Sequence, residues 1–251
     1  MRFHFYYIHF IYYNTPCLLR GPMTPLTPEQ LAALRHIDSP TVSNAIERFD
    51  VRPRVDGFAG WELRCAFPEI GTTVGYALTC TADSTTNSRA DERGLLRLWE
   101  ALEKAPQPSV VVIKDIGPER NRSCHMGEVM ATTAKAFGAV GCVSDGGLRD
   151  VMEVRALGGF QYFCPGFVAS HGNPVICDIN VEVTLAGLAV RPGDLLHGDV
   201  NGIVVVPASV ADRVADEAAR VREMERELLE FVRKPGLTVE KLRRFRERFT
   251  H

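Results

Sequence analysis

Two short polar clusters near the middle of the chain combine residue types that can bind a metal ion and an oxo acid. Gly127-Glu128 opens a run with helical spacing, and Arg149-Asp150 opens the next such run. The planar guanidinium of Arg149 suits a carboxylate or a developing enolate oxygen, and the Asp150 carboxylate is a hard oxygen ligand for Mg²⁺ or Mn²⁺. Acids in a first helical turn and adjacent Arg-Asp pairs are also common on solvated surfaces, so this spacing alone does not establish a site.

The segments around these clusters predict where they lie. The apolar runs 109–113 and 139–144 are typical of buried strands, 161–164 predicts a third strand, and helices are expected over 128–137 and 149–157. In this βαβαβ order both clusters stand outside the carboxyl ends of parallel strands. Ligands usually bind α/β folds at that place, so we expect the two clusters to form one site.

The start of the helix at Glu128 offers further binding groups. The backbone N–H groups of Glu128, Val129 and Met130 can hold a carboxylate, because the first turn of a helix has unpaired donors and a favourable dipole. Gly127 lets a ligand approach the backbone closely. Glu128 could also hold a metal-bound water from a second side.

The rest of the chain predicts one α/β domain. A capping box at Thr27 marks the first helix, and no internal repeat or long linker divides the sequence. The turn pairs Pro192-Gly193 and Asn201-Gly202 favour antiparallel strands within 175–206. The further predicted elements are helices over 27–36, 39–49, 91–104, 209–233 and 239–248, and a strand over 74–80.

Composition restricts the partners. The formal net charge of -2 and the pI near 6.4 give no general field for nucleic acid or an anionic membrane, so we expect neither as a partner. The seven cysteines are scattered and never spaced as CxxC, which argues against a zinc ribbon or a disulfide framework and favours a reducing cytoplasm.

The first 22 residues differ from the rest. They are rich in Phe and Tyr, but they lack a small-residue cleavage site and are too short and polar to span a membrane. We expect Met23 to be the natural start, with 1–22 an extension without function and 23–251 a single domain with a C-terminal helical extension. The alternative for 1–22 is a short interfacial or partner-binding segment.

Three stretches resemble the class II pyruvate aldolase family, which comprises 4-hydroxy-4-methyl-2-oxoglutarate aldolases and RraA-like proteins. Glu128 is followed after twenty residues by Arg149-Asp150, the stretch 191–207 is similar to the family's second characteristic block, and 39–49 resembles its opening helix. The likeness covers roughly residues 31–229. It implies an α/β/β/α sandwich of the swivelling-domain type, with mixed central sheets and a long C-terminal helix, assembled as homotrimers or hexamers.

The resemblance also implies roles for particular residues. Gly127, Glu128, Val129 and Met130 would form a substrate cradle, Arg149 would contact the substrate, Asp150 would bind Mg²⁺ or Mn²⁺ directly, and Glu128 would act on the metal through a bound water. An acid from a neighbouring subunit's C-terminal helix would lie near that water. Our candidate is Glu225, with Glu223 and Glu227 as rivals.

Two departures from the family pattern concern the substrate. Many members have Asp where this chain has Asn44, and the segment 119–126 has no counterpart that we can match. That segment contains His125, which we interpret as a loop histidine without a role, with a substrate contact as the alternative.

The implied activity is metal-dependent retro-aldol cleavage of a 4-hydroxy-2-oxo acid, of the 4-hydroxy-4-methyl-2-oxoglutarate type, to pyruvate. The catalytic residues would be Arg149 and Glu128, with the metal and Arg149 stabilising the pyruvate enolate. The same enolate would serve oxaloacetate decarboxylation.

A Schiff-base aldolase using Lys114 is disfavoured, because that lysine ends an apolar strand with no activating group beside it in sequence. The alternative from another class is a non-catalytic RraA-like regulator that binds a ribonuclease, but the complete set of Glu128, Arg149 and Asp150 favours the enzyme.

Overall fold

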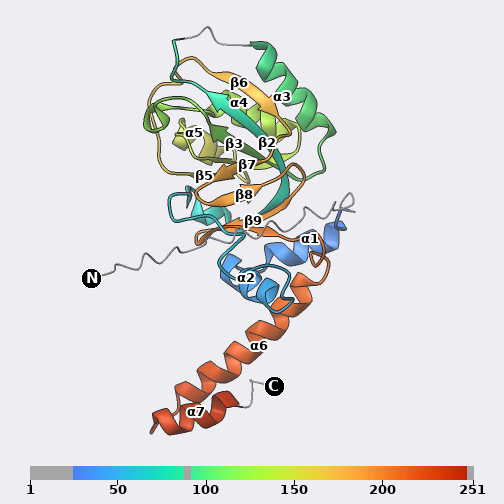
Figure 1. The fold of residues 1–251 in the computed structure, drawn as a ribbon, viewed down its shortest axis with the longest axis vertical. Helices are drawn as coiled ribbons and strands as arrows, with labels where there is room; N and C mark the ends of the chain where they lie inside the picture. The colour runs from blue at the N-terminus through green and yellow to red at the C-terminus, as the bar shows by residue number, and fades with distance from the viewer. Residues whose placement is uncertain (1–24, 88–91, 248–251) are drawn as a thin grey trace, which may run out of the picture.

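A mixed eight-stranded sheet forms the centre of the molecule in a computed structural model that describes residues 25–87 and 92–247 (Figure 1). Its order is β1-β5-β4-β3-β2-β9-β10, β6 pairs with β2 beside this path, and β7 and β8 form a separate hairpin. The strands are β1 (Arg64–Cys65), β2 (Thr73–Asp83), β3 (Ser109–Asp115), β4 (Ala139–Ser144), β5 (Gln161–Cys164), β6 (Val175–Ile179), β7 (Val183–Leu185), β8 (Leu188–Val190), β9 (Leu195–Asp199) and β10 (Gly202–Val206).

The strands β2, β3, β4 and β5 are parallel, and the others pair antiparallel. The parallel strands are joined by helices, as a parallel connection requires. The helices are α1 (Pro28–Arg35), α2 (Ser39–Glu47), α3 (Glu92–Lys104), α4 (Glu128–Ala136), α5 (Val151–Ala156), α6 (Val214–Val232) and α7 (Val239–Glu247), with short 3-10 turns at Pro68–Ile70 and Arg120–Arg122.

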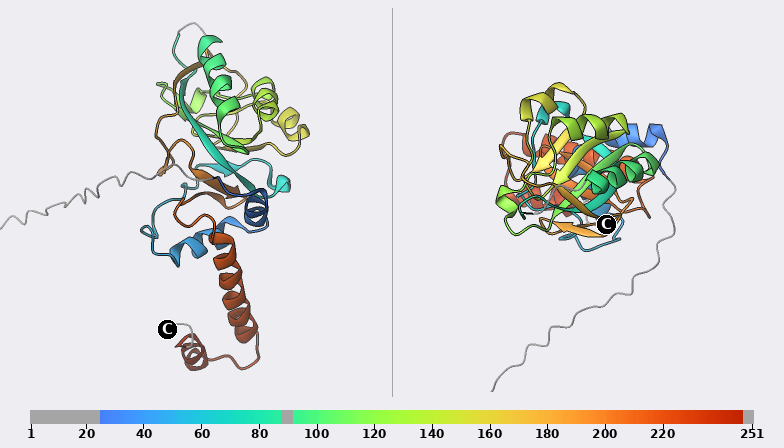
Figure 2. Two further views of the ribbon diagram at one scale, coloured as in Figure 1. Left: turned by 90° about the vertical axis from the view of Figure 1, so that its right-hand side faces the viewer. Right: turned by 90° about the horizontal axis from the view of Figure 1, so that it is seen from above.

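Helices cover two separate outer faces of this sheet (Figure 2). The helices α3, α4 and α5 pack on the parallel strands, where Leu98 and Val154 meet Val111. The helices α1, α2 and α6 pack on the other part, where Ile46 meets Val204. A third core fills the inner side, between the parallel strands, β9–β10 and the β7–β8 hairpin. The order of layers is therefore helix, strand, strand, helix.

The long strand β2 takes part in all three cores. Val74 and Tyr76 face the group of α1, α2 and α6, Leu78 and Cys80 face the group of α3, α4 and α5, and Ala77 points to the inner core. This follows from its eleven residues and the alternation of side chains along a strand. One strand therefore connects the two halves of the sandwich.

The C-terminal helices form an arm that projects from the body (Figure 1). In α6 the buried residues lie in the first part, Val214 to Val221, and the rest of the helix is largely exposed. The helix α7 folds back so that the ring of Phe245 stacks on that of Phe231, with centroids 4.2 Å apart.

The predicted α/β class, the mixed sheet and the βαβαβ order are confirmed. Two helices begin later than expected. The helix expected from Arg149 starts at Val151, because Asp150 has a left-handed backbone conformation that a helix cannot include. The helix expected from Ser209 starts at Val214, after a succession of turns. The expectations for residues 1–22 and for a helix start at Asp91 lie outside the described residues.

No helix within residues 25–87 and 92–247 is both long enough and apolar enough to cross a membrane.

Candidate functional site

The two polar clusters predicted from the sequence lie side by side at the carboxyl edge of the parallel strands. Gly127 is the N-cap of α4 and Asp150 is the N-cap of α5. The Asp150 Oδ2 accepts a 2.8 Å hydrogen bond from the backbone N–H of Glu128. This carboxylate therefore caps α4 from another segment of the chain, and its charge lies at the positive end of that helix.

Asp150 is held in place from several directions. Its backbone has φ 57° and ψ 47°, a conformation that Asp tolerates better than most residues. Its Oδ2 lies 3.4 Å from the Arg149 Nε, and about a third of each side chain is exposed (32% for both). No residue of the described ranges donates a hydrogen bond to its other oxygen, Oδ1. A carboxylate that is about a third exposed, with one oxygen hydrogen-bonded and the other without a donor among these residues, fits a divalent metal that keeps water or substrate as its other ligands.

The α4 helix start retains free donors beside this carboxylate. The first intrahelical bond runs from the Ala131 N–H to the Gly127 carbonyl, so the N–H groups of Val129 and Met130 have no acceptor within the helix. The Glu128 N–H is engaged by Asp150. Of the three amides considered from the sequence, two are thus open to a ligand. The Glu128 side chain is exposed in the same first turn.

Gly127 is required where the two clusters meet. Its backbone is extended (φ -131°, ψ -168°), so its conformation does not demand glycine. A Cβ at this position, however, would stand 2.4 Å from the Asp150 Oδ2 and 2.8 Å from the Arg149 Nε. Glycine is needed because these side chains approach the backbone closely.

Backbone pairing fixes the segments that carry the clusters. The His125 N–H donates to the Gly147 carbonyl at 3.1 Å, the Gly147 N–H to the Ser123 carbonyl at 3.1 Å, and the Arg149 N–H to the Met126 carbonyl at 3.0 Å. This short parallel ladder sets the distance between the α4 start and Asp150. The site is therefore organised by its own backbone.

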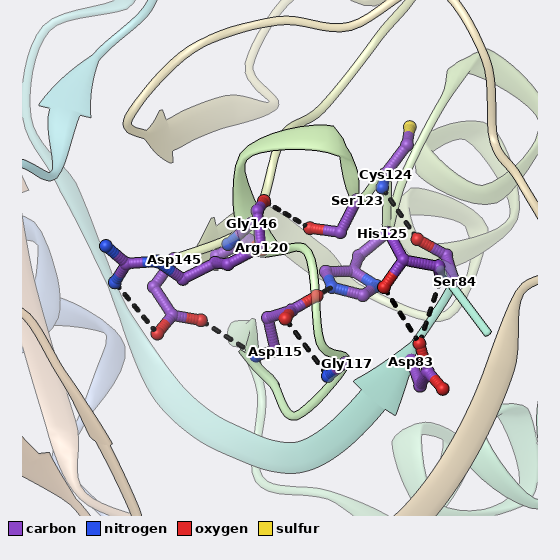
Figure 3. Close-up of polar contacts among 12 residues, drawn as sticks. Asp83, Ser84, Asp115, Gly117, Arg120, Ser123, Cys124, His125, Asp145 and Gly146 are labelled. Carbon is purple, nitrogen blue, oxygen red and sulfur yellow. Dashed lines mark hydrogen bonds and ion pairs between the residues drawn. The ribbon is translucent and has the colours of Figure 1, made fainter.

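A buried acid and histidine support this ladder from the sheet side (Figure 3). The His125 Nε2 lies 2.6 Å from the Asp115 Oδ2, and each side chain is 1% exposed. Burial would raise the pKa of Asp115, but hydrogen bonds from His125 and Ser123 outweigh it and lower the pKa. His125 lies in the loop before α4 as a buried partner of Asp115, and the interpretation that it has no role in the chemistry remains a prediction. No local sequence pattern indicates this pair, because it forms only when the loop after β3 folds back.

Lys114 and Asp145 form a second buried contact beside it. The Lys114 Nζ lies 2.5 Å from the Asp145 Oδ2, and the Asp115 N–H donates to Oδ1 of the same carboxylate at 2.7 Å. Arg120 lies 3.7 Å from that carboxylate (Figure 3). An ion-paired lysine is a poor candidate for Schiff-base chemistry, which needs a neutral amine.

Cys124 lies next to the candidate site, with its side chain buried. Burial raises the pKa of its thiol, and the nearby Arg149 only partly offsets this effect. Since the thiolate is the reactive form, Cys124 is unsuited to act as a nucleophile.

Glu225 does not meet the other site residues within one chain. It lies on α6, which projects away from α4 and α5 (Figure 1), and its Oε1 accepts a 3.2 Å hydrogen bond from the Asn44 side chain. Across residues 25–87 and 92–247, no three His, Cys, Asp or Glu side chains gather as a metal-binding group.

Comparisons with known proteins show which proteins this chain is similar to. Uncharacterized protein MJ0644 of Methanocaldococcus jannaschii is 33% identical over 121 residues, which are 48% of this chain and 58% of that protein. A Halalkalibacterium halodurans protein named "Putative 4-hydroxy-4-methyl-2-oxoglutarate aldolase" is 33% identical over 126 residues, which are 50% of this chain and 59% of that protein. The chain thus matches less than two thirds of the length of these relatives.

Two solved structures share the fold over most of their length. An uncharacterized protein from Pseudomonas syringae pv. tomato has a TM-score of 0.69 at 24% identity, covering 92% of this chain and all of that one (100%). Streptomyces coelicolor RraAS2, described as an unusual member of the RNase ES inhibitor RraA protein family, has a TM-score of 0.62 at 25% identity, covering 84% of this chain and 99% of that one.

A family model with the description Aldolase/RraA matches residues 39–205. This range contains Gly127 to Met130 together with Arg149 and Asp150, whereas Glu225 lies beyond it. Because the match spans more than half of the sequence, the chain belongs to the RraA-like family.

Proposed function

We propose that this protein is a divalent-metal-dependent lyase that cleaves a 4-hydroxy-2-oxo acid to pyruvate. The observation that carries the proposal is the partly exposed Asp150 carboxylate, fixed through Oδ2 beside Arg149 and two free α4 amides. The names of several relatives as 4-hydroxy-4-methyl-2-oxoglutarate aldolases support the same reaction class.

Each residue of the site would have a role that fits its chemistry. The N–H groups of Val129 and Met130 would hold the substrate carboxylate, as helix starts do for anions. Arg149 would bind the oxygen on which negative charge develops when the carbon bond breaks. A divalent metal held by Asp150 would supply Lewis-acid polarisation of the 2-oxo group. Glu128 would hold water at the edge of the site, and oxaloacetate decarboxylation, which forms the same enolate, would share these groups.

The proposal includes assembly into a trimer or hexamer. One chain provides a single directly placed carboxylate, so a second acid would come from the projecting arm of a neighbouring copy. Glu223, Glu225 and Glu227 all lie on α6, beyond its last buried residue, Val221. A monomeric enzyme with full activity in dilute solution would contradict this part of the proposal.

The test is pyruvate release from 4-hydroxy-4-methyl-2-oxoglutarate and from oxaloacetate, coupled to lactate dehydrogenase, with Mg²⁺ and then with EDTA. Asp150→Asn is the informative variant, because Asn also tolerates the left-handed conformation but binds divalent metals more weakly. We expect EDTA to abolish release and Asp150→Asn to reduce kcat/KM at least 100-fold. Asp212→Asn is the matched control, since Asp212 also lies beside an arginine but is exposed (59%) away from the site. Full metal-dependent cleavage by Asp150→Ala or Asp150→Asn would refute the assignment.

A second candidate function is a non-catalytic regulator of a ribonuclease. The similarity to the Streptomyces coelicolor protein of the RNase ES inhibitor family favours it. Capture of an endoribonuclease by the protein, together with no effect of Mg²⁺ on its thermal stability in the presence of pyruvate, would favour this function over the lyase.

A further inference from the structure

A polar pocket of about 490 Å³ opens at the carboxyl edge of the sheet and has no role in the site described above. Three loops wall it, namely residues 84–87 after β2, 119–122 after β3 and 168–173 after β5. Loops at this edge carry the ligands of α/β folds, so the position itself suits a binding site.

Contacts between the loops hold the pocket open without a ligand. The Asp83 Oδ1 accepts from the Thr85 N–H at 2.8 Å, and its Oδ2 accepts from the Thr86 hydroxyl at 2.6 Å. The Asn173 side chain donates to the Thr86 carbonyl at 3.0 Å, and the Asn173 N–H donates to the Ser84 carbonyl at 2.9 Å. The loop after β5 is thereby tied to the loop after β2, and both walls are fixed.

The lining is rich in hydroxyl and amide groups and carries little net charge. Its two charged residues, Glu119 and Arg122, pair with each other at 2.8 Å. A carboxylate entering the pocket would have to compete with Glu119 for this arginine, whereas a neutral hydroxylated chain would find donors and acceptors on three sides. The hydroxyl and amide side chains are those of Ser84, Thr85, Thr86, Asn87, Asn121, Ser170 and Asn173.

The pocket borders both segments that end in the candidate site. The Ser84 hydroxyl accepts a 2.9 Å hydrogen bond from the Cys124 N–H, three residues before Gly127 (Figure 3). The Val168 N–H donates to the Leu148 carbonyl at 3.0 Å, one residue before Arg149. These two hydrogen bonds join the walls of the pocket to the segments that carry Gly127 and Arg149.

We propose that this pocket holds the part of the substrate beyond C4, and that the substrate is a 2-oxo acid with an uncharged, polyhydroxylated chain, such as a 2-oxo-3-deoxy sugar acid. The inference rests on the proposed lyase function and specifies its substrate class. Cleavage breaks the bond between C3 and C4. The 4-hydroxyl gives its proton to a base and becomes the carbonyl of a hydroxyaldehyde, while C3 leaves with the electron pair as the pyruvate enolate and then takes up a proton. No oxidant or reductant is needed.

The test compares pyruvate release from 2-oxo-3-deoxygluconate, 4-hydroxy-4-methyl-2-oxoglutarate and oxaloacetate by the full chain with Mg²⁺. We expect kcat/KM for the sugar acid to exceed that for the dicarboxylate at least 10-fold. Asn121→Leu and Ser170→Val, on two different walls, should each raise KM for the sugar acid at least 10-fold with little change in kcat. Both residues are exposed, and an unchanged melting temperature will show that the fold is retained.

The outcomes separate the two proposals. Cleavage of the dicarboxylate alone, with no effect of Asn121→Leu or Ser170→Val, would leave the lyase standing and overturn the inference. Selective loss of dicarboxylate cleavage in Arg122→Gln would also overturn it, because the pocket would then bind a second carboxylate. Pyruvate release from none of the three substrates would remove both proposals.

Discussion

Replacing Gly127 by alanine tests whether the close approach of Asp150 to the α4 start creates the site. The added methyl group would stand 2.4 Å from the Asp150 Oδ2, and real Cβ contacts essentially never fall below 3.0 Å. The carboxylate must therefore retreat, and its 2.8 Å hydrogen bond from the Glu128 N–H lengthens or breaks. The Arg149 side chain, 2.8 Å from the same Cβ, must move as well.

The magnitude follows from the bond that is lost. A hydrogen bond to a charged group contributes about 1.5–3 kcal/mol, which corresponds to a roughly 10- to 150-fold change in an equilibrium or rate constant. We expect kcat/KM for pyruvate release to fall by such a factor. The free energy of unfolding should fall by less than this contribution of about 1.5–3 kcal/mol, because the backbone at Gly127 is accessible to alanine and the restriction of the unfolded chain offsets part of the loss.

The assay is the coupled measurement of pyruvate with saturating Mg²⁺, accompanied by urea denaturation. Gly166→Ala is the matched control, since a Cβ there meets no atom within 4 Å and its φ is not left-handed. Gly166 also lies near the site, because its carbonyl accepts from the Leu148 N–H. Unchanged kinetics in Gly127→Ala with an unchanged denaturation midpoint would refute the idea that Asp150 must hold this position.

Two further predictions concern stability. Burial lowers the pKa of His197, whose ring nitrogens contact the Ser39 hydroxyl at 3.0 Å and the Leu34 carbonyl at 3.1 Å. His197 therefore takes up a proton near pH 6.5 in the unfolded chain but only at lower pH in the folded chain, so the free energy of unfolding should fall as the pH drops below about 6.5. In His197→Gln, the midpoint of urea denaturation should depend less on pH between 7.5 and 5.5. An equal pH dependence of the midpoint in both proteins would contradict this origin. The Tyr162 hydroxyl is buried without a hydrogen-bond partner among the described residues. Tyr162→Phe should therefore raise the free energy of unfolding, by up to about 1 kcal/mol. If the midpoint of guanidinium denaturation falls instead, the hydroxyl is hydrogen-bonded to an ordered water.

The sequence predicted the central elements well because local physical rules govern them. The β-branched run 110–113, within the buried strand predicted over 109–113, lies in β3 of the helix-covered sheet, and the capping box at Thr27 forms as expected. The adjacency of Gly127 and Asp150 followed from parallel strand order alone. The two-residue strand Arg64–Cys65 was not predicted, because it is too short to show an alternating pattern.

Other features depend on contacts between distant segments. The left-handed backbone of Asp150 arises where its carboxylate reaches α4, and nothing next to it in sequence signals this. The pair of Asp115 and His125 needs the nine residues between them, 116–124, to fold back toward the strand. The pocket beside them needs three loops at once, so no single stretch of sequence could indicate it. The proposed contribution of Glu225 depends on a neighbouring copy and remains a prediction.

The long strand β2 also has a consequence for how the molecule comes apart. One end of β2 packs against α1, α2 and α6, the other end packs against α3, α4 and α5, and its middle packs in the inner core. Neither half of the sandwich can therefore detach without exposing apolar surface of the other half. Amide hydrogens of β2 should therefore exchange with solvent only through complete opening of the body. The outer part of α6 and the whole of α7 share none of these cores, so their amides should exchange earlier. The arm can thus open while the body that carries Asp150 stays intact.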